Sequence, residues 1–334
     1  MPKVSIIIPC FNEEATIGAT LDAIYAQTFS RADMEVVVAD AMSTDSTRGV
    51  IAEFSQAHAA LSVRVVDNLV RFIPAGLNRA IESARGEVIV RMDAHAKPYP
   101  DYVENCVRAL QLKKGDNVGG VWEIQPGGPG WLSAGIAVAA AHPLGAGDAA
   151  YRLKPEAGAV DTVPFGAYHK SLVEKIGVFD ESLLANEDYE FNARVRQAGG
   201  VVWLDPNIRS IYYARPDLSG LARQYARYGF WKWRMLARYP RTIRWRQWLP
   251  PLFVAGFIVL SALSIFAPSA RLLLAAQLGI YSLALLFVAF MQAYQKKSPD
   301  LFFSVPLALM TMHFAWGGGF LWSMLTSLFG AKNG

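Results

Sequence analysis

The first third of the chain alternates short apolar runs with amphipathic segments. The first apolar run is continuous, as in strands that are buried on both faces of a parallel sheet. The four runs cover residues 4–9, 35–40, 63–68 and 87–93. A segment with apolar residues at helical spacing follows each of them, for example Ile17, Leu21 and Ile24 after the first. Four consecutive strand–helix units predict an α/β fold with a doubly wound sheet.

Glycine and proline mark the places where this pattern is interrupted. We expect the third helix to begin at Pro74 and to end near Gly86, because proline favours the first turn and glycine follows the last. Residues 119–147 are rich in Gly, Pro and Ala, which predicts a loop with one short helix. The apolar segment 135–142 within it is too short to span a membrane.

The C-terminal third has a different pattern, with three long runs that contain no Asp, Glu, Lys or Arg. These runs are residues 248–267, 272–294 and 301–329. About 20 helical residues cross the hydrocarbon core of a bilayer, so each run is long enough to span it. Three such runs in succession favour membrane spans over buried helices of a soluble domain. We therefore expect a cytoplasmic domain at 1–214, basic and aromatic helices at the membrane interface at 215–247, and three transmembrane helices at 248–329.

Charged residues indicate the orientation in the membrane. The N-terminal apolar run is shorter than a secretory signal and acids follow it directly, which predicts that the large domain stays in the cytoplasm. Arginines precede the first span, Lys296 and Lys297 separate the second from the third, and Arg271 lies in the opposite loop. This distribution predicts a multi-pass protein of the inner (cytoplasmic) membrane with its C-terminus outside. Cys10 and Cys106 are too few for a disulfide framework and are consistent with a reducing compartment.

The formal net charge of +4 owes much to the segment before the first span. Nine Lys or Arg residues occur from Arg215 to Arg246 against one acid, Asp217, and tyrosines and tryptophans are interleaved with them. Such a mixture can bind nucleic acid. Directly before a membrane span it favours anionic headgroups instead, so we expect membrane lipids and no nucleic acid as partners.

Polar residues at the predicted strand ends are candidates for ligand binding, because ligands bind beyond the carboxyl ends of strands in such sheets. Asp40 could accept hydrogen bonds from a nucleobase or ribose; alternatively, it caps the next helix. Asp93 and His95 follow the fourth strand, and on an extended chain their side chains point the same way. They could hold Mg²⁺ or, because imidazole favours softer metals, Mn²⁺. Alternatively, His95 only hydrogen-bonds a loop carbonyl.

The segment 185–200 has the composition of a helix with acids in its first turn. Asn186 is placed to cap this helix, and Glu187 and Asp188 follow it. The two acids either complement the helix dipole or supply a general base, Asp188, which a helix N-terminus would keep ionised. The sequence contains neither a dinucleotide-binding glycine fingerprint nor a P-loop, so NAD chemistry and ATP hydrolysis lose their usual support.

Several of these motifs occur together in an order that resembles a known family. They are SIIIPCFNEE, Asp40 followed by STDST, AGLNRAIE, DAH, FDESL and NEDYE. In this order they resemble the inverting nucleotide-sugar glycosyltransferases of family 2, which have a GT-A fold, over roughly residues 4–235. Within that family, RMDAHAKPYPDYVE and VDTVPFGAYHKS are similar to the succinoglycan-type, ExoA-like glucosyltransferases. The D-x-D motif of the family is Asp93-Ala94-His95 here, which is the form of that branch.

The resemblance implies a role for each residue that matches the family. Asp188 would be the catalytic base, with Glu187 beside it near the acceptor. Asp93 and His95 would hold a divalent cation on the diphosphate, preferably Mn²⁺, with Mg²⁺ as the alternative. Asp40 would contact the uracil or ribose. The other residues that would border the nucleotide are Pro9, Asn12, Glu13 and Arg71.

The segment QYARY, residues 224–228, lies where many membrane-bound members carry Q-x-x-R-W. Gln224 and Arg227 match that motif, and Arg227 would contact the diphosphate; Tyr228 departs from it, which argues against a processive polysaccharide synthase. The implied reaction moves a sugar from a UDP-sugar, by family analogy UDP-glucose, to a hydroxyl of a polyprenyl-diphosphate-linked saccharide. Inversion would give a β-glycoside, in the synthesis of an exopolysaccharide or a cell-surface glycan.

Three other functions are alternatives. A polyprenyl-phosphate sugar transferase would use the lipid phosphate as acceptor and would need little from Asp188, because a phosphate is already ionised. A processive synthase that exports its polymer is disfavoured, since three spans are few for a pore. A channel or transporter with a nucleotide-sensing domain is disfavoured because, apart from His313, the spans offer no charged candidate to line a path.

Overall fold

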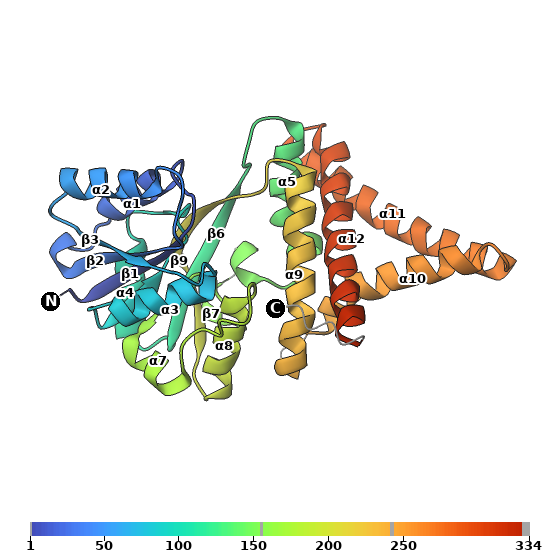
Figure 1. Cartoon of the computed structure of the whole chain (residues 1–334). Helices are drawn as coiled ribbons and strands as arrows, with labels where there is room; N and C mark the ends of the chain where they lie inside the picture. Colours follow the sequence, from blue (N-terminus) through green and yellow to red (C-terminus); the bar gives the residue numbers. More distant parts are fainter. Residues whose placement is uncertain (1, 154–155, 241–243, 329–334) are drawn as a thin grey trace. The chain divides into compact units, whose positions relative to one another are not determined.

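The computed structural model describes most of the chain (Figure 1). The described residues are 2–153, 156–240 and 244–328. They form two compact units, and the chain passes between these units more than once. The first unit runs to Glu123 and includes Ala149–Tyr212; the second contains Ile124–Asp148 and the chain from Tyr213 onward. The expected division into residues 1–214, 215–247 and 248–329 stays a prediction.

The first unit is built on a nine-stranded sheet. Its first four strands are parallel and pair in the order β3-β2-β1-β4. They are β1 (Val4–Cys10), β2 (Met34–Asp40), β3 (Ser62–Asp67) and β4 (Val88–Arg91). The sheet continues with β8, which is antiparallel to β4, and then with β6, β9 and β5, while β7 pairs with β9. These strands are β5 (Lys97–Pro98), β6 (Asn117–Gln125), β7 (Gly158–Ala159), β8 (Ala167–His169) and β9 (Val202–Tyr213).

Helices cover both faces of this sheet (Figure 1). Successive strand residues point to opposite faces, so Ile6 and Ile8 of β1 pack in one core and Ile7 packs in the other. Helices on the first face are α1 (Ile17–Tyr25), α2 (Thr47–Ala57) and α4 (Tyr102–Gln111). Helices on the second face are α3 (Ile73–Ser83), α7 (Lys170–Ile176) and α8 (Glu187–Gln197). The predicted α/β fold with a doubly wound sheet is therefore confirmed, with antiparallel strands added to it.

The third helix ends earlier than expected. Pro74 lies in the first turn of α3 as predicted, but the helix ends at Ser83 rather than near Gly86. Gly86 lies against β1, where an added Cβ atom would be 2.7 Å from the backbone N of Ser5. The close approach of two backbone segments, and not the end of a helix, therefore explains this glycine.

The Gly-rich segment 119–147 begins with a strand instead of the expected loop. Gly119 and Gly120 belong to β6. A Cβ atom on Gly120 would lie 1.6 Å from the carbonyl oxygen of Ile208 in β9, so the two strands approach too closely for a larger residue. Glycine is depleted in most strands, and this composition conceals β6 in the sequence. The helices that follow are α5 (Trp131–Ala140) and α6 (Pro143–Ala146).

The second unit consists mainly of helices. Besides α5 and α6 they are α9 (Leu218–Arg238), a 3₁₀ helix (Trp245–Trp248), α10 (Leu249–Leu263), α11 (Pro268–Lys296) and α12 (Leu301–Leu328). Among the described residues, three helical segments are long and apolar enough to cross a membrane: Trp245–Leu263, Pro268–Lys296 and Leu301–Leu328. They overlap the expected spans at 248–267, 272–294 and 301–329. Phe329, the expected end of the third span, and Arg241 of the basic segment lie outside the described residues.

Candidate active site

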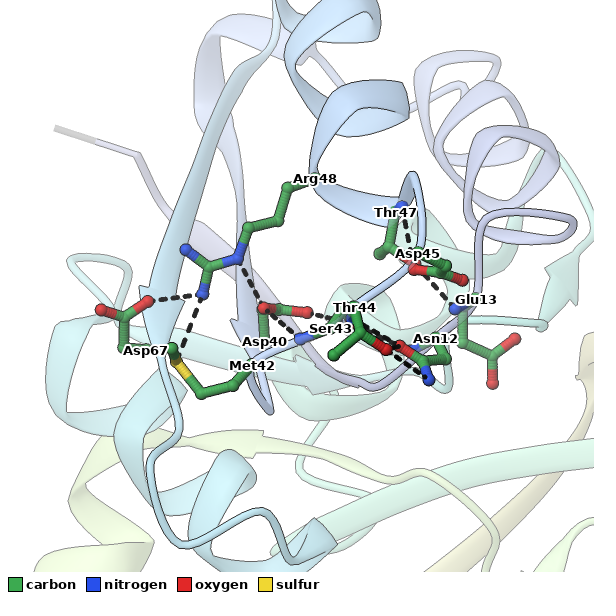
Figure 2. Close-up of polar contacts among 10 residues, drawn as sticks. All are labelled: Asn12, Glu13, Asp40, Met42, Ser43, Thr44, Asp45, Thr47, Arg48 and Asp67. Atoms are coloured by element: carbon green, nitrogen blue, oxygen red, sulfur yellow. Dashed lines mark hydrogen bonds and ion pairs between the residues drawn. The ribbon is translucent and has the colours of Figure 1, made fainter.

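Asp40 is the last residue of β2 and is fully buried at the carboxyl edge of the parallel strands. Its carboxylate accepts hydrogen bonds from the backbone N and the hydroxyl of Ser43, at 3.1 and 2.5 Å. Nε of Arg48 contacts the same carboxylate at 2.6 Å, and Nη2 of Arg48 reaches Oδ1 of Asp67 at 2.5 Å (Figure 2). Hydrogen bonds to Asp67 and Asp40 raise the pKa of the Arg48 guanidinium. The carboxylate of Asp40 is thus a hydrogen-bond acceptor held in a fixed orientation. It lies at the edge of the sheet where ligands of such folds bind.

The loops that follow β1 and β2 are joined to each other (Figure 2). Asn12 has a left-handed backbone (φ 52°), which asparagine tolerates better than most residues. Its backbone N donates to Ser43 Oγ at 2.9 Å, and its side-chain Oδ1 accepts from Thr44 N at 2.8 Å. The backbone N of Glu13 donates to Thr47 Oγ1 at 2.8 Å. These bonds bring the predicted nucleotide-contacting residues of the two loops together.

The chain around Asp93 and His95 is not extended as we expected. β4 ends at Arg91, and the backbone N of Ala96 donates to the carbonyl of Asp93 at 3.0 Å, which closes a turn. His95 lies within this turn, and its Nδ1 is 3.0 Å from Oε1 of Glu13. The imidazole ring therefore contacts a carboxylate. Burial acts to raise the pKa of Glu13, but hydrogen bonds, chiefly with His95, hold that pKa below its ordinary value. The turn thereby connects the loop after β1 to the end of β4.

A divalent cation is compatible with these residues as a partial set of ligands. Within the residues that the structure describes, no group of three or more His, Cys, Asp or Glu side chains could hold a metal by itself. Mg²⁺ and similar cations are usually bound through one or two carboxylates, with substrate phosphates and waters as the other ligands. Asp93 and His95 supply a carboxylate and an imidazole, which fits such a shared site and a metal such as Mn²⁺.

Arg91 of β4 is a candidate site residue that our sequence interpretation missed. Its side chain is buried, yet it contacts three carboxylates from two parts of the chain. Nη2 lies 3.2 Å from Asp93 Oδ1 and 2.9 Å from Glu187 Oε1, and Nη1 contacts Oδ1 of Asp188. Burial opposes the charge, but the three carboxylates, Asp188 foremost, raise the pKa of Arg91. The sequence did contain a signal for Arg91, namely an arginine in an otherwise apolar strand. Because buried arginines are almost always paired, such a residue indicates a carboxylate partner nearby.

Asp188 lies in the first turn of α8, next to Glu187. Asn186 precedes the helix as expected, but it has a left-handed backbone (φ 65°) instead of the extended conformation of an N-cap residue. Burial raises the pKa of Asp188 to about 7; Arg91 opposes this effect, and Glu187 and Asp93 add to it. Burial therefore acts against the ionised form that we expected the helix N-terminus to favour.

The remaining predicted residues fall in two places. Pro9 lies in β1 beside Ala39 of β2. Arg71 follows β3 with a left-handed backbone (φ 65°), and its backbone N donates to the carbonyl oxygen of Asn68 at 3.2 Å. Both therefore lie near the carboxyl edge with Asp40. The other two, Gln224 and Arg227, belong to α9 in the second unit, where Gln224 Nε2 donates to the hydroxyl of Tyr228 at 3.0 Å. The role of each predicted residue stays a prediction.

Comparisons with known proteins agree with this fold and extend over most of the chain. The model of Glycosyl transferase family 2 matches residues 5–177. The chain is 30% identical over 326 residues to the succinoglycan biosynthesis protein ExoA of Rhizobium meliloti, covering 94% of this chain and 93% of the relative. It is 29% identical over 317 residues, 94% of each chain, to the dolichyl N-acetyl-alpha-D-glucosaminyl phosphate 3-beta-D-2,3-diacetamido-2,3-dideoxy-beta-D-glucuronosyltransferase of Methanococcus voltae.

Solved structures resemble the chain at lower sequence identity. The mannosyltransferase PcManGT of Pyrobaculum calidifontis, solved with GDP-Man and Mn²⁺, has a TM-score of 0.66 at 22% identity and covers 96% of this chain and 87% of its own. Residues 1–349 of S. aureus TarS have a TM-score of 0.50 at 16% identity, with 94% and 90% covered. These likenesses support the fold, and the sequence matches establish the family. The chain is therefore a GT-A-fold glycosyltransferase that belongs to glycosyl transferase family 2 and resembles its ExoA-like members.

Proposed function

We propose that this chain transfers a sugar, with inversion, from a UDP-sugar to a hydroxyl group of a polyprenyl-diphosphate-linked saccharide. One observation carries the proposal: Arg91 holds Asp93, the predicted cation ligand, together with Glu187 and Asp188. A transfer of this kind needs a group that activates the acceptor beside a group that stabilises the leaving diphosphate. The guanidinium of Arg91 joins side chains with these two proposed roles.

Asp188 is the proposed base. Its carboxylate accepts the proton of the acceptor hydroxyl while that oxygen attacks the anomeric carbon from the side opposite to the diphosphate. An α-linked donor therefore gives a β-glycoside. A base is most effective when its pKa lies near the working pH, and the pKa of Asp188 is raised to about 7. Glu187 is placed beside it to contact the acceptor.

Asp93 and His95 are the proposed protein ligands of a divalent cation, Mn²⁺ in preference to Mg²⁺. When bound, the cation neutralises charge on the departing diphosphate. Glu13 positions His95 through the contact between Oε1 and Nδ1. Arg91 positions Asp93 through Oδ1. The Pyrobaculum structure was solved with GDP-Man and Mn²⁺, but for this chain the proposal rests on the two side chains.

The nucleotide is proposed to bind at the carboxyl edge of β1, β2 and β3. Asp40 accepts hydrogen bonds from the uracil or ribose, and Arg48 holds Asp40 in position for this contact. The residues that border the nucleotide are Pro9, Asn12, Glu13 and Arg71. Gln224 and Arg227 of α9 are proposed to contact the diphosphate. UDP-glucose is the donor that we propose, by analogy with the ExoA-like branch.

The acceptor proposal is supported by the names of the relatives. The Methanococcus relative is named for transfer to a dolichyl-linked N-acetylglucosaminyl phosphate, and ExoA for succinoglycan biosynthesis. A lipid-linked saccharide also explains why the chain carries helices that could enter a membrane. We place the catalytic unit on the cytoplasmic side of the inner membrane, where nucleotide sugars are made, in exopolysaccharide or cell-surface glycan synthesis.

The reaction can be tested with membranes that contain the full chain. They are incubated with a panel of labelled nucleotide sugars and lipid extracts, and the lipid product is identified by mass spectrometry. We expect label from UDP-glucose on a lipid that already carries a sugar. Label on polyprenyl phosphate alone would instead identify a polyprenyl-phosphate sugar transferase, and long polymer would identify a processive synthase. A product without lipid would contradict the proposed acceptor.

A further inference from the structure

Helix α12 has two faces of different character. One face carries the buried residues, which occur from Leu301 to Ser323. The large side chains exposed on the other face are all apolar: Phe303, Leu307, Met310, Trp322, Leu325 and Leu328. They form two groups, 303–310 and 322–328, with a spacing of three or four residues within each group. The helical period places both groups on one side of α12, and between them Phe314 packs against Phe253 and Tyr281. We call this set the exposed stripe of α12.

The buried face of α12 is covered by other helices of the same unit along its length. Near its start, α5 packs so closely that a Cβ atom on Gly135 would lie 2.2 Å from Cβ of Ser304. Farther along, Nε2 of His313 lies 2.8 Å from the carbonyl oxygen of Leu144 in α6. As a result, 39% of an apolar stretch of 18 residues in α12 is buried within the chain. The corresponding share is 11% for Trp245–Leu263 and 17% for α11.

The second half of α12 packs against α9, and the two helices lie side by side (Figure 1). Added Cβ atoms on Gly229 and Gly319 would lie 2.0 and 2.2 Å from carbonyl oxygens of the facing helix. The indole Nε1 of Trp233 donates to Ser327 Oγ at 3.2 Å, which extends the contact toward the end of α12. Such close backbone contact fixes the position of α9 relative to α12.

Helix α9 is strongly basic, and this decides where α12 can lie. The cations on it are Arg223, Arg227, Lys232, Arg234 and Arg238. If α12 crossed the bilayer, α9 would be carried into or along the hydrocarbon with these charges. Charged side chains at the bilayer centre are costly and rare. A basic helix packed along a second helix is compatible with the headgroup region, where each cation near an anionic surface is favourable.

The helices α10 and α11 differ from α12 in this respect. They meet α12 where Phe253 of α10 and Tyr281 of α11 pack with His313 and Phe314. From there they project away from α12, on the side opposite to α9, and converge at their tip (Figure 1). Arg271 at the tip donates through Nε to the carbonyl oxygen of Ser264 at 2.7 Å. The hairpin carries its cations at its two ends, as a membrane-spanning hairpin requires.

We propose that α10 and α11 cross the membrane as a hairpin while α12 lies along the cytoplasmic surface of the bilayer, with its exposed stripe toward the lipid chains. The partner that contacts the exposed stripe is thus an anionic lipid surface. Two arguments select it: the two groups of the exposed stripe flank Phe314, where α12 meets the apolar hairpin, and α9 supplies positive charge on the other face of α12. This arrangement places the C-terminus in the cytoplasm and replaces the three expected spans by two. It concerns attachment and is independent of the proposed reaction.

The side on which the C-terminus lies tests this arrangement in cells. Full-length chain is fused at its C-terminus to green fluorescent protein, which fluoresces in the cytoplasm, or to alkaline phosphatase, which is active outside it. The matched control carries the same reporters at the hairpin tip, after Ala267. We expect fluorescence and no phosphatase activity at the C-terminus, and phosphatase activity at the tip. Phosphatase activity at the C-terminus would overturn the proposal.

The depth of α12 can be measured without a fusion. Single cysteines replace Phe303, Met310 or Leu325 of the exposed stripe, and the purified full chain is labelled and placed in phosphatidylcholine–phosphatidylglycerol vesicles. Cys10 and Cys106 are buried. The control positions, exposed residues of α11, are Leu273, Leu283 and Tyr294. Each set covers about 30 Å of helix at 1.5 Å per residue, the thickness of the bilayer core.

Depth-dependent quenching then separates the two arrangements. We expect the three α12 labels to lie at one shallow depth, while the middle α11 label, at position 283, is the deepest of its set. A maximum of depth at position 310, with positions 303 and 325 near opposite surfaces, would overturn the proposal. Because no step of this test requires turnover, its failure would leave the proposed reaction untouched, and the reverse also holds.

Discussion

The guanidinium of Arg91 on β4 contacts the carboxylate of Asp188 at the start of α8, although the two residues are far apart in the sequence. The same guanidinium contacts Asp93 and Glu187. One buried cation therefore positions both the proposed base and the proposed cation ligand. A buried charge whose partners are removed is strongly destabilising, so this cluster also anchors α8 to the sheet.

Replacing Arg91 should affect turnover more than donor binding. Arg91→Ala leaves three carboxylates without their cation, and we expect a loss of about 100-fold or more in kcat, together with lower stability by about 3–5 kcal/mol. Arg91→Lys keeps the charge without the forked geometry and should recover stability more than kcat. Arg79→Ala, which breaks an exposed ion pair with Glu82, is the control and should change little. Full kcat in Arg91→Lys would show that the fork does not matter.

The pH dependence of kcat/KM should report Asp188. A base must be ionised, and a pKa raised to about 7 means that the carboxylate takes up a proton as the pH falls through neutrality. Activity is therefore expected to be full well above pH 7 and to fall about tenfold per pH unit below it. An unperturbed aspartate, with a pKa of about 3.9, would keep full activity to below pH 5. A profile that is flat from pH 5 to pH 8 would contradict the assignment.

His95 should control the cation requirement. We expect Mn²⁺ to support more activity than Mg²⁺ and EDTA to abolish it. His95→Ala should raise the Mn²⁺ concentration needed for half-maximal activity by about tenfold, because one of two protein ligands is lost, while binding of UDP without metal changes little. Glu13→Gln, which keeps a hydrogen-bond acceptor for His95 Nδ1, should have a smaller effect. Equal activity in EDTA would remove the metal from the account.

Asp40 should control the affinity for the nucleotide. Asp40→Asn weakens a buried acceptor held by Ser43 and Arg48, and we expect the donor KM to rise about tenfold or more with a smaller change in kcat. Asp67→Asn removes the other carboxylate on Arg48 but is half exposed, with 57% of its side chain accessible, and serves as the control. Equal effects of the two substitutions on KM would indicate that Arg48, and not Asp40, matters.

The overall α/β fold could be predicted from the sequence because apolar periodicity reports which faces are buried. The apolar runs that became β1 to β4 alternated with segments that became helices. β6 was missed because Gly119 and Gly120 have no side chains that could show a strand pattern. Gly120 is required because the backbone of β9 passes too close for a larger residue. Gly86 was misinterpreted for the same reason, since its neighbour Ser5 is distant in the sequence.

The candidate site could be predicted only in part. Motifs at strand and helix ends made Asp40, Asp93 and Asp188 candidates, and their roles stay predictions. The contacts that orient them were not, because they depend on residues that meet only in the folded chain, such as His95 with Glu13. Likewise, the raised pKa of Asp188 follows from burial, which a sequence position at a helix N-terminus does not reveal.

The most direct test of the proposed chemistry is turnover of Asp188→Asn in the membrane assay with the lipid-linked acceptor. The substitution keeps the size of the side chain but removes its basicity, and Glu187→Gln is the matched neighbour. We predict that kcat falls by about 100-fold or more, with donor binding and folding preserved, because a positioned base contributes about 10²–10⁴-fold. Glu187→Gln should lose less. Turnover close to that of the unaltered chain would contradict a hydroxyl acceptor activated by Asp188.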